Sequence, residues 1–408
     1  MAELTLPEAD WRARGGLDVL LDALGAREGL SRYVGGAVRD TLLGLPVADV
    51  DIATRIAPED VMKRIRSAGL RAVPTGLAHG TVTAVLDDGP VEVTTLRRDV
   101  STDGRRATVA FSDDWREDAA RRDFTINALY ADPASGEIFD YFGGLADLEA
   151  GRITFIGDPL VRIAEDHLRI LRFFRFHARF GRGEPDPAGY AACAARANDL
   201  MALSRERIAD ELLKLLALPD PAPTLALMME GGILAPVLPE IDGHGVEALR
   251  RLVRFEAAAG VAPDAIRRLA ALLPRDPAIG DAVGARLKLS NAQRKRIAAA
   301  LVADTDRTPR TLAYRIGKPG AIDRLLLTAG DPEAGATAVA TLGGWDVPEL
   351  PIGGGALVER GLVAGPMVAR ALRAIEERWL DEDFPGAERV GAIADEVVDQ
   401  TLREVRKA

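Results

Sequence analysis

The segment from residue 32 to residue 52 constrains the fold more than any other part of this sequence. A short apolar run ends at Gly35 and Gly36, which allow a sharp backbone turn and carry no side chain that would keep a ligand away. A helix is expected to begin near Ala37, and its free backbone N–H groups favour a bound phosphate, with Arg39 one turn further on. The segment therefore predicts a strand, a glycine turn that seats phosphate, a short helix and a second strand.

Two aspartates, Asp49 and Asp51, lie at the start of that second strand. Because alternate residues of a strand point to the same side, both carboxylates share one face while Val50 and Ile52 face the core. Neighbouring carboxylates raise each other's pKa unless a cation lies between them. Mg²⁺ prefers such oxygen ligands and takes one or two carboxylates together with substrate phosphates. The pattern therefore predicts a magnesium site next to the phosphate-binding glycine turn.

The bulk properties limit the class of protein. A chain of 408 residues, 48% of them hydrophobic, is long enough for two or three domains. A single cysteine, Cys193, excludes an internal disulfide framework and indicates a reducing compartment, so we expect the cytoplasm. The acidic N-terminus does not resemble a signal peptide, and no apolar run is long enough to predict a membrane span. A net charge of −10 disfavours a basic coat for nucleic acid but permits a local basic face.

Two strands joined by a turn are predicted at residues 79–86 and 91–96. Glu92 on the second strand has two open interpretations: a third acid for the metal site, or an ordinary glutamate that faces solvent. The following residues, 97–115, are polar and lack periodicity, which predicts a long loop of the kind that often forms a lid.

A helix is predicted at residues 117–130, where Asp123 and Asn127 are four residues apart and so share a face. We expect the first domain to end near residue 145. From residue 163 onward the pattern is helical throughout.

The most informative helix is predicted at residues 165–180. At about 100° per residue its arginines fall on one arc, with Asp166 at the edge. Residues 152–182 hold seven arginines against three acids, a local excess that the net charge hides. The arginines of the arc are Arg169, Arg172, Arg175 and Arg179.

Asp166 and Arg169 have two alternative interpretations. A carboxylate accepts hydrogen bonds and a guanidinium donates them, so the pair matches the amino group and ring nitrogen that cytosine and adenine both present. Uracil and guanine present the opposite order and would be rejected. The alternative is an ordinary surface salt bridge between residues three apart, worth about 0.3 kcal/mol.

Taken together, five motifs occur in an order that resembles the class II CCA-adding enzymes, which are tRNA nucleotidyltransferases of the CCA/poly(A) polymerase family. The resemblance implies an α+β fold: a polymerase-beta-like nucleotidyltransferase head with a small mixed sheet, then an all-α neck, body and tail. The implied domains are the catalytic head at 1–145, a base-recognising neck at 146–218, and a tRNA-binding body and tail at 219–408. The motifs lie at residues 35–40, 49–53, 91–97, 121–128 and 165–169.

The resemblance also implies roles for individual residues. Asp49 and Asp51 would be the catalytic residues and bind Mg²⁺. The base would be read by Asp166 and Arg169, supported by two further arginines of the same helix. The implied nucleotide-binding set is Gly36, Arg39, Arg121, Arg122, Asp123, Asn127, Asp166, Arg169, Arg172 and Arg175.

The expected activity is the addition of C, C and A to the 3′ end of tRNA without a nucleic-acid template. The expected partners are CTP, ATP and the 3′ end and acceptor arm of tRNA, with no membrane. The 97–115 segment looks full length, which in this family favours addition of all three nucleotides over CC alone. The alternatives are a poly(A) polymerase on the same scaffold, an enzyme that adds only CC, and an RNA-binding protein with an inactive site.

Overall fold

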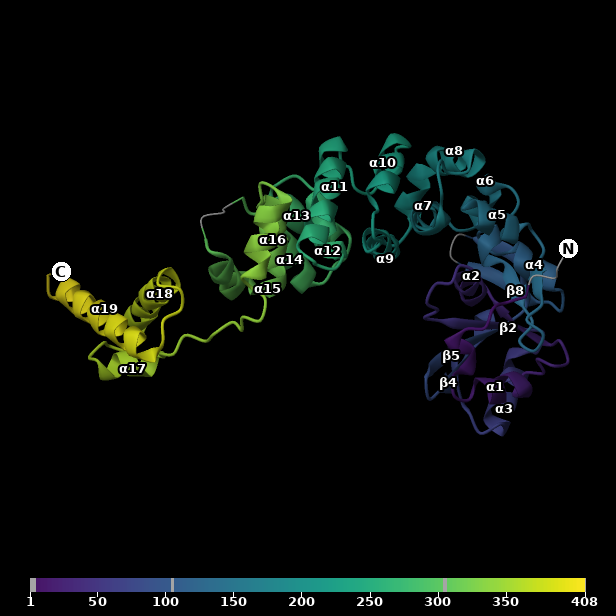
Figure 1. Ribbon diagram of the computed structural model, residues 1–408, viewed down its shortest axis with the longest axis horizontal. Helices are drawn as coiled ribbons and strands as arrows, with labels where there is room; N and C mark the ends of the chain where they lie inside the picture. The colour runs from purple at the N-terminus through teal and green to yellow at the C-terminus, as the bar shows by residue number, and fades with distance from the viewer. Residues whose placement is uncertain (1–4, 104–105, 304–306, 408) are drawn as a thin grey trace. The chain divides into compact units, whose positions relative to one another are not determined.

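The computed structural model describes residues 5–103, 106–303 and 307–407. The chain divides into two compact units, Met1–Ile241 and Asp242–Ala408. The first unit combines strands with helices, and the described residues of the second form helices only (Figure 1). The predicted α+β class, with strands in the N-terminal part and helices after it, is confirmed. The domain boundaries expected at residues 145 and 218 stay predictions.

A seven-stranded mixed sheet forms the centre of the first unit, in the order β3-β4-β5-β2-β1-β8-β9. Strand β2 runs parallel to β5 and antiparallel to β1. It therefore lies between the strand that leads into the glycine turn and the strand that carries Glu92. The strands are β1 (Ser31–Val34), β2 (Val50–Thr54), β3 (Arg71–Gly76), β4 (Thr81–Leu86), β5 (Gly89–Thr95), β8 (Leu129–Ala131) and β9 (Ile138–Asp140).

Helices bury the sheet with apolar side chains at helical spacing. Leu17 and Leu20 of α1, Ile65 of α3 and Ile52 of β2 are fully buried. Cys193 on α8 is also buried. The helices of this unit are α1 (Leu17–Ala23), α2 (Gly36–Leu42), α3 (Pro58–Ser67), α4 (Trp115–Ala120), α5 (Gly144–Ala150), α6 (Pro159–Glu165), α7 (Arg169–Phe180), α8 (Pro187–Ala195), α9 (Arg205–Leu216) and α10 (Ala222–Glu230).

The prediction of a single helix at residues 117–130 is wrong. Helix α4 ends at Ala120, and a short 3-10 turn and strand β8 follow. Phe124 has an extended backbone, and Tyr130 pairs with Val34 in the sheet. The apolar residues of this stretch are buried on the sheet, so tertiary packing overrides the helical spacing.

The prediction of a long loop at residues 97–115 is also wrong. Strands β6 (Arg97–Asp103) and β7 (Arg106–Phe111) pair as an antiparallel hairpin, and α4 begins at Trp115. A register shift between Asp99 and Ser101 marks an irregular position in the pairing. Polar residues on a two-stranded hairpin give no alternating apolar pattern, which is why periodicity did not predict it.

The predicted helix at 165–180 is divided. Helix α6 ends at Glu165, Asp166 has an extended backbone, and α7 begins only at Arg169. Asp166 therefore lies in a connection and not on the arginine helix. The spacing of arginines within α7 itself is as predicted.

The second unit is held together by apolar clusters and a buried network of ion pairs. Trp379 and Ile375 lie in one such cluster, and Glu256 accepts hydrogen bonds from Arg267 and Arg268 at 2.7 and 2.9 Å. No helix in the described residues is long and apolar enough to cross a membrane. The helices are α11 (Gly243–Ala258), α12 (Ala265–Leu272), α13 (Pro277–Arg286), α14 (Asn291–Ala300), α15 (Pro309–Thr328), α16 (Pro332–Ala340), α17 (Gly354–Glu359), α18 (Pro366–Asp381) and α19 (Ala387–Lys407).

Candidate active site

A cavity of about 410 Å³ lies in the first unit, between the glycine turn, the start of β2, residues 122–127 and α7. It brings together segments that are far apart in the sequence. The predicted site residues that line it are Gly36, Arg39, Asp49, Asp51, Arg122, Asp123, Asn127, Arg172 and Arg175.

The glycine turn requires glycine at its first position. Gly35 has φ 70°, a left-handed conformation that favours glycine. A Cβ atom there would also lie 3.4 Å from Nη1 of Arg122 and 3.5 Å from the carbonyl oxygen of Asn127. The turn therefore holds the start of α2 close to these two residues.

Three carboxylates lie on or next to the neighbouring strands β2 and β5. Asp49 precedes β2 and is exposed, Asp51 lies within β2, and Glu92 lies beside Asp51 in register on β5. Burial raises the pKa of Asp51 to about 6, with Glu92 and Asp49 adding to the rise and Arg122 opposing it. The donors are all hard oxygens, which fits a magnesium site.

Few side chains near Asp51 could serve as metal ligands. In the described part of the chain, no three His, Cys, Asp or Glu side chains converge as a group that could hold a metal ion by themselves. A metal held by Asp49 and Asp51 would therefore need oxygens from its substrates, as Mg²⁺ commonly does. Glu92 raises the pKa of Asp51, and its role as a ligand stays a prediction.

Arg122 is fixed by a buried group that the sequence analysis missed. Its Nη2 lies 3.3 Å from Oδ2 of Asp118, and its Nε donates to the Tyr130 hydroxyl at 3.2 Å. Tyr130 donates in turn to Asp118 at 2.7 Å. Burial raises the pKa of Asp118, but Arg122 and Arg121 outweigh it and lower the value to about 2. The sequence feature that could have predicted this contact is the acid four residues before Arg122, because residues four apart share a helix face.

A second chain of contacts links the glycine-turn helix to α7. Asp123 accepts hydrogen bonds from Nε and Nη2 of Arg172 at 2.8 and 2.5 Å and from the Asn127 amide at 3.0 Å. The side-chain oxygen of Asn127 accepts from Arg39. Asp123 and Asn127 therefore do lie side by side, although no helix joins them. Both side chains hold arginines in place, Arg172 through Asp123 and Arg39 through Asn127.

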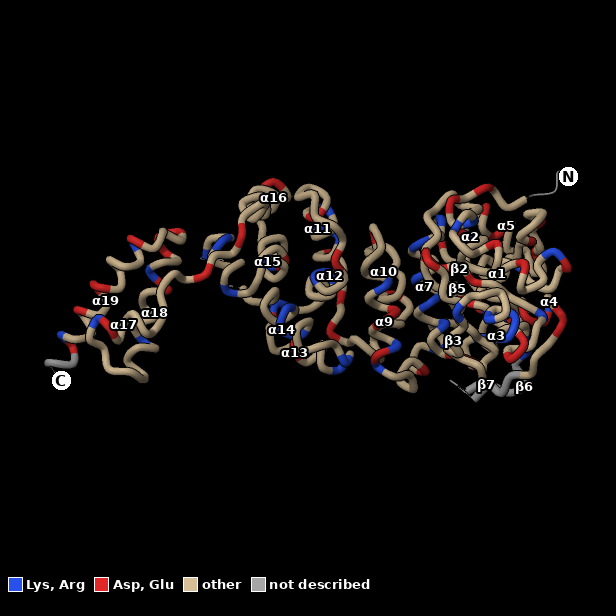
Figure 2. The backbone as a smooth tube through the Cα atoms, turned by 90° about the horizontal axis from the view of Figure 1, so that it is seen from below, with Lys and Arg blue, Asp and Glu red and all other residues tan. Residues whose placement is uncertain are grey.

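The arginine face of α7 lines the cavity. Figure 2 shows basic residues along α7 beside the sheet. Glu211 of α9 is 4% exposed and accepts a hydrogen bond from Nε of Arg175 at 2.6 Å, with Nη1 of Arg172 at 3.8 Å. Arg179 pairs with Asp40 at 3.2 Å. One buried glutamate of α9 thus pairs with two arginines of the predicted nucleotide-binding set, Arg172 and Arg175.

Three predicted residues do not line the cavity. Arg121 pairs with Asp118 at 2.7 Å. Asp166 accepts from Arg207 of α9 at 2.7 Å, while Arg169 pairs with Glu165 and donates to the Arg121 carbonyl at 3.1 Å. The alternative of a salt bridge between Asp166 and Arg169 is therefore wrong, because each has a separate partner.

Replacing Glu211 by glutamine should weaken nucleotide binding through Arg172 and Arg175. The amide keeps the size of the side chain but loses the charge that binds Arg175 and lies near Arg172. We expect the KM for CTP to rise about tenfold, since charge-assisted hydrogen bonds contribute about 1.5–3 kcal/mol. Steady-state kinetics measure this.

Glu206→Gln, on the same helix and exposed, is the matched control. An unchanged KM for Glu211→Gln would show that the two arginines do not depend on this contact.

Known proteins resemble this chain along most of its length. A family model for the poly A polymerase head domain matches residues 31–154, and one for a probable RNA- and SrmB-binding site of polymerase A matches residues 184–244. CCA tRNA nucleotidyltransferase 1, mitochondrial, of Mus musculus is 34% identical over 92% of this chain and 89% of the relative. The CCA-adding enzyme of Limosilactobacillus fermentum is 34% identical over 86% and 88% of the two chains.

A solved structure agrees with these relatives. The Bacillus stearothermophilus CCA-adding enzyme, in complex with CTP, superposes with a TM-score of 0.76 at 29% identity, and covers 96% of this chain and 99% of its own. The protein is therefore an enzyme of the nucleotidyltransferase class. Within that class, the chain belongs to the family of CCA tRNA nucleotidyltransferases, the CCA-adding enzymes.

Proposed function

We propose that this enzyme adds C, C and A in turn to the 3′ end of tRNA, with CTP and ATP as substrates and Mg²⁺ as cofactor. One observation supports the proposal: two neighbouring aspartates and a cluster of arginines line the same cavity. That arrangement suits a nucleoside triphosphate, whose phosphates bind cations while a metal joins them to carboxylates. The relatives' names supply tRNA as the second substrate.

The residues of the site have different roles in the proposed reaction. Asp49 and Asp51 would hold Mg²⁺, which in such a site activates the terminal ribose hydroxyl and stabilises the charge of the in-line transition state. Arg39, Arg172 and Arg175 bind and orient the triphosphate, because guanidinium groups match phosphate oxygens in pairs. Asp118 fixes the guanidinium of Arg122 next to Asp51, where it can neutralise developing charge.

Base selection is assigned to Asp166 and Arg169. Support comes from the contacts that hold them: Arg207 bonds the Asp166 carboxylate at 2.7 Å, and Arg169 is fixed by Glu165 and by two carbonyl groups. Both side chains are only partly buried, so their remaining hydrogen-bonding atoms can meet a base.

Asp166→Ala should relax the choice of nucleotide. The remaining Arg169 donates hydrogen bonds but cannot accept one from an amino group, so the discrimination against UTP and GTP falls. We expect incorporation of UTP relative to CTP to rise about tenfold or more, because one lost hydrogen bond to a charged group costs about 1.5–3 kcal/mol. Primer extension on tRNA lacking CCA measures the ratio.

The exposed Asp210→Ala, which removes a carboxylate paired with Lys214 one helical turn away, is the control for this measurement. Equal exclusion of UTP and GTP by Asp166→Ala and the natural enzyme would end the assignment of base reading to Asp166.

The length of the product tests the activity as a whole. A tRNA that lacks CCA, incubated with CTP and ATP, should gain three nucleotides and then stop. A long A tail would identify a poly(A) polymerase, the alternative that the name of the matched head domain keeps open. A stop after two C residues would identify a CC-adding enzyme.

The cellular location proposed is the cytoplasm. The single cysteine, Cys193, is buried as a free thiol, which suits a reducing compartment. The mouse relative is mitochondrial by name. Fractionation of cells with an antibody against the protein decides between the two compartments.

A further inference from the structure

A cavity of about 690 Å³ in the second unit has no part in the proposed reaction. It is bounded by α11, the end of α12 with the residues after it, and the end of α15. Its size falls within the range of about 300–1,000 Å³ that is typical of small-molecule sites. Leu252, Leu272 and Leu326 form a buried apolar floor.

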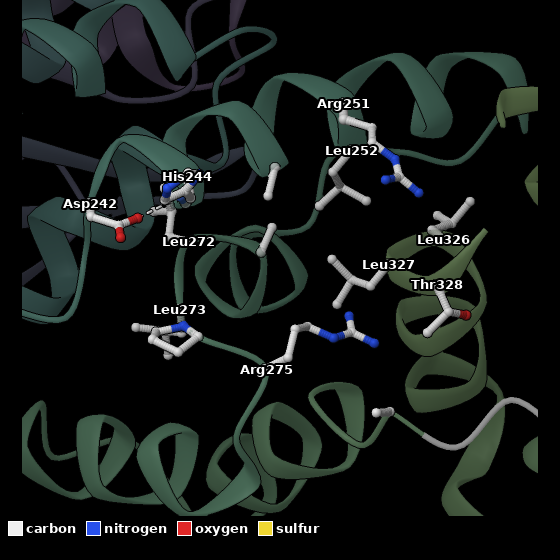
Figure 3. A pocket seen from close by; sticks show the side chains of 15 residues that line it. Asp242, His244, Arg251, Leu252, Leu272, Leu273, Arg275, Leu326, Leu327 and Thr328 are labelled. Atoms are coloured by element: carbon white, nitrogen blue, oxygen red, sulfur yellow. Dashed lines mark hydrogen bonds between the residues drawn. The ribbon is translucent and has the colours of Figure 1, made fainter. Parts of the chain in front are cut away.

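Two exposed arginines line the same cavity. Arg251 comes from α11 and Arg275 from the residues between α12 and α13. Figure 3 shows both side chains extending toward the side of the cavity where Leu327 and Thr328 lie. Two guanidinium groups that come from different segments and point to the same side of a cavity can together bind the oxygens of a phosphate.

The positive charge of these arginines is not balanced by their surroundings. Arg251 donates a hydrogen bond to the Ala329 carbonyl, and Arg275 has no hydrogen bond or ion pair in the described part of the chain. Burial lowers the pKa of Arg275, and the nearby charges of Arg324 and Arg251 lower it further. A bound anion would relieve this repulsion.

The lining contains one described carboxylate, which has another role. Asp242 caps α11 by accepting a hydrogen bond from the Gly245 N–H at 3.0 Å. In Figure 3 it lies beside His244, away from the two guanidinium groups. It leaves the arginine end of the cavity positively charged.

We propose that this cavity is a second ligand site, which binds a small phosphate ester with its phosphate between Arg251 and Arg275. The nonpolar part of the ligand lies on the leucine floor and extends toward His244. An apolar floor with a few charged groups on one side is the usual construction of a small-molecule site. A flat RNA-binding surface needs no such recess. The inference is independent of the reaction proposed for the first unit.

The four histidines of the chain allow a site-specific test with the full-length protein. His244 is the one that lines this cavity, and none lines the candidate active site. The protein is labelled with ¹³C at histidine Cε1, the His244 signal is assigned with His244→Gln, and adenosine 5′-monophosphate is titrated. We expect a saturable shift of the His244 signal that inorganic phosphate competes away and that adenosine does not produce.

Arg275→Gln is the decisive variant, because this exposed side chain makes no hydrogen bond or ion pair with any residue that the structure describes. Loss of one of two guanidinium groups should weaken binding about tenfold or more. Arg250→Gln, the adjacent exposed arginine on α11 that pairs with Glu247, is the control and should keep the natural affinity. A melting curve for each variant confirms that it is folded.

Any of four outcomes would overturn the proposal, and the first three concern the mononucleotide titration. They are a His244 signal that does not shift, an equal affinity in Arg275→Gln and the natural protein, and an equal response to adenosine. A fourth is a His244 shift produced by a short RNA duplex but not by the mononucleotide, which would make the cavity part of an RNA surface. None of these results would alter the product-length test of tRNA extension.

Discussion

Asp51→Asn is expected to abolish nucleotide transfer, with a loss of about 10³-fold or more in the rate of the chemical step. The asparagine keeps the shape of the side chain but removes one of the two charges that would hold Mg²⁺. A metal ion contributes several kcal/mol to the transition state, and each 1.36 kcal/mol is about tenfold in rate. Single-turnover incorporation of CMP into tRNA lacking CCA measures the loss.

The same variant should bind tRNA with nearly natural affinity in a filter-binding assay. Asp60→Asn, which removes an exposed carboxylate paired with Lys63 on α3, is the control and should keep full activity. Transfer by Asp51→Asn at more than a tenth of the natural rate would remove this aspartate from the metal site.

Asp51 also predicts an effect on stability. Its folded pKa, about 6, lies above the ordinary value of 3.8, because burial and the neighbouring acids disfavour the charged form. The folded state therefore binds a proton more tightly than the unfolded state, so this group lowers the free energy of unfolding as pH rises from about 4 to 6. Without Mg²⁺ at pH 8, Asp51→Asn should melt about 2–4 °C higher than the natural enzyme. An unchanged or lower melting temperature would contradict this account of Asp51.

Asp118→Ala is expected to have the largest effect on stability in the site. Its side chain is 1% exposed and accepts from Arg121, Arg122 and Tyr130. Removing one partner of a buried charge pair costs about 3–5 kcal/mol, since it leaves the other charges uncompensated. The free energy of unfolding in urea measures the loss, and transfer should fall as well, because Arg122 is no longer held next to Asp51.

Glu117→Ala is the matched control, because this neighbour on α4 is 41% exposed, pairs with Arg98 only at 3.9 Å and accepts one hydrogen bond, from the Ser112 hydroxyl at 2.6 Å. It should lose no more than about 1 kcal/mol. If Asp118→Ala unfolds at the natural urea midpoint, the buried network does not stabilise this unit.

The motif residues were predictable where one short segment decides the geometry. Alternation along a strand placed Val50 and Ile52 in the core, and helical spacing placed Arg172 and Arg175 on one face of α7. Both patterns depend on backbone periods that tertiary packing rarely changes. Most of the residues that line the candidate cavity could therefore be predicted from the sequence.

The supporting residues could not be predicted in the same way. Glu211 and Arg207 lie on α9 and reach the site only because that helix packs beside α7. The stretch from residue 121 to 130 has helical spacing, yet its apolar side chains gain more by burial on the sheet. Hydrophobic periodicity records which face is buried and not what it is buried against.

The buried thiol of Cys193 has a practical consequence. Burial raises its pKa, so the thiolate that reacts with alkylating reagents is scarce. A cysteine introduced at the surface of the β6–β7 hairpin, for example Arg98→Cys, would therefore be labelled by a maleimide dye while the natural thiol stays unreacted. Fluorescence from that single position can then report whether the hairpin moves as CTP is exchanged for ATP.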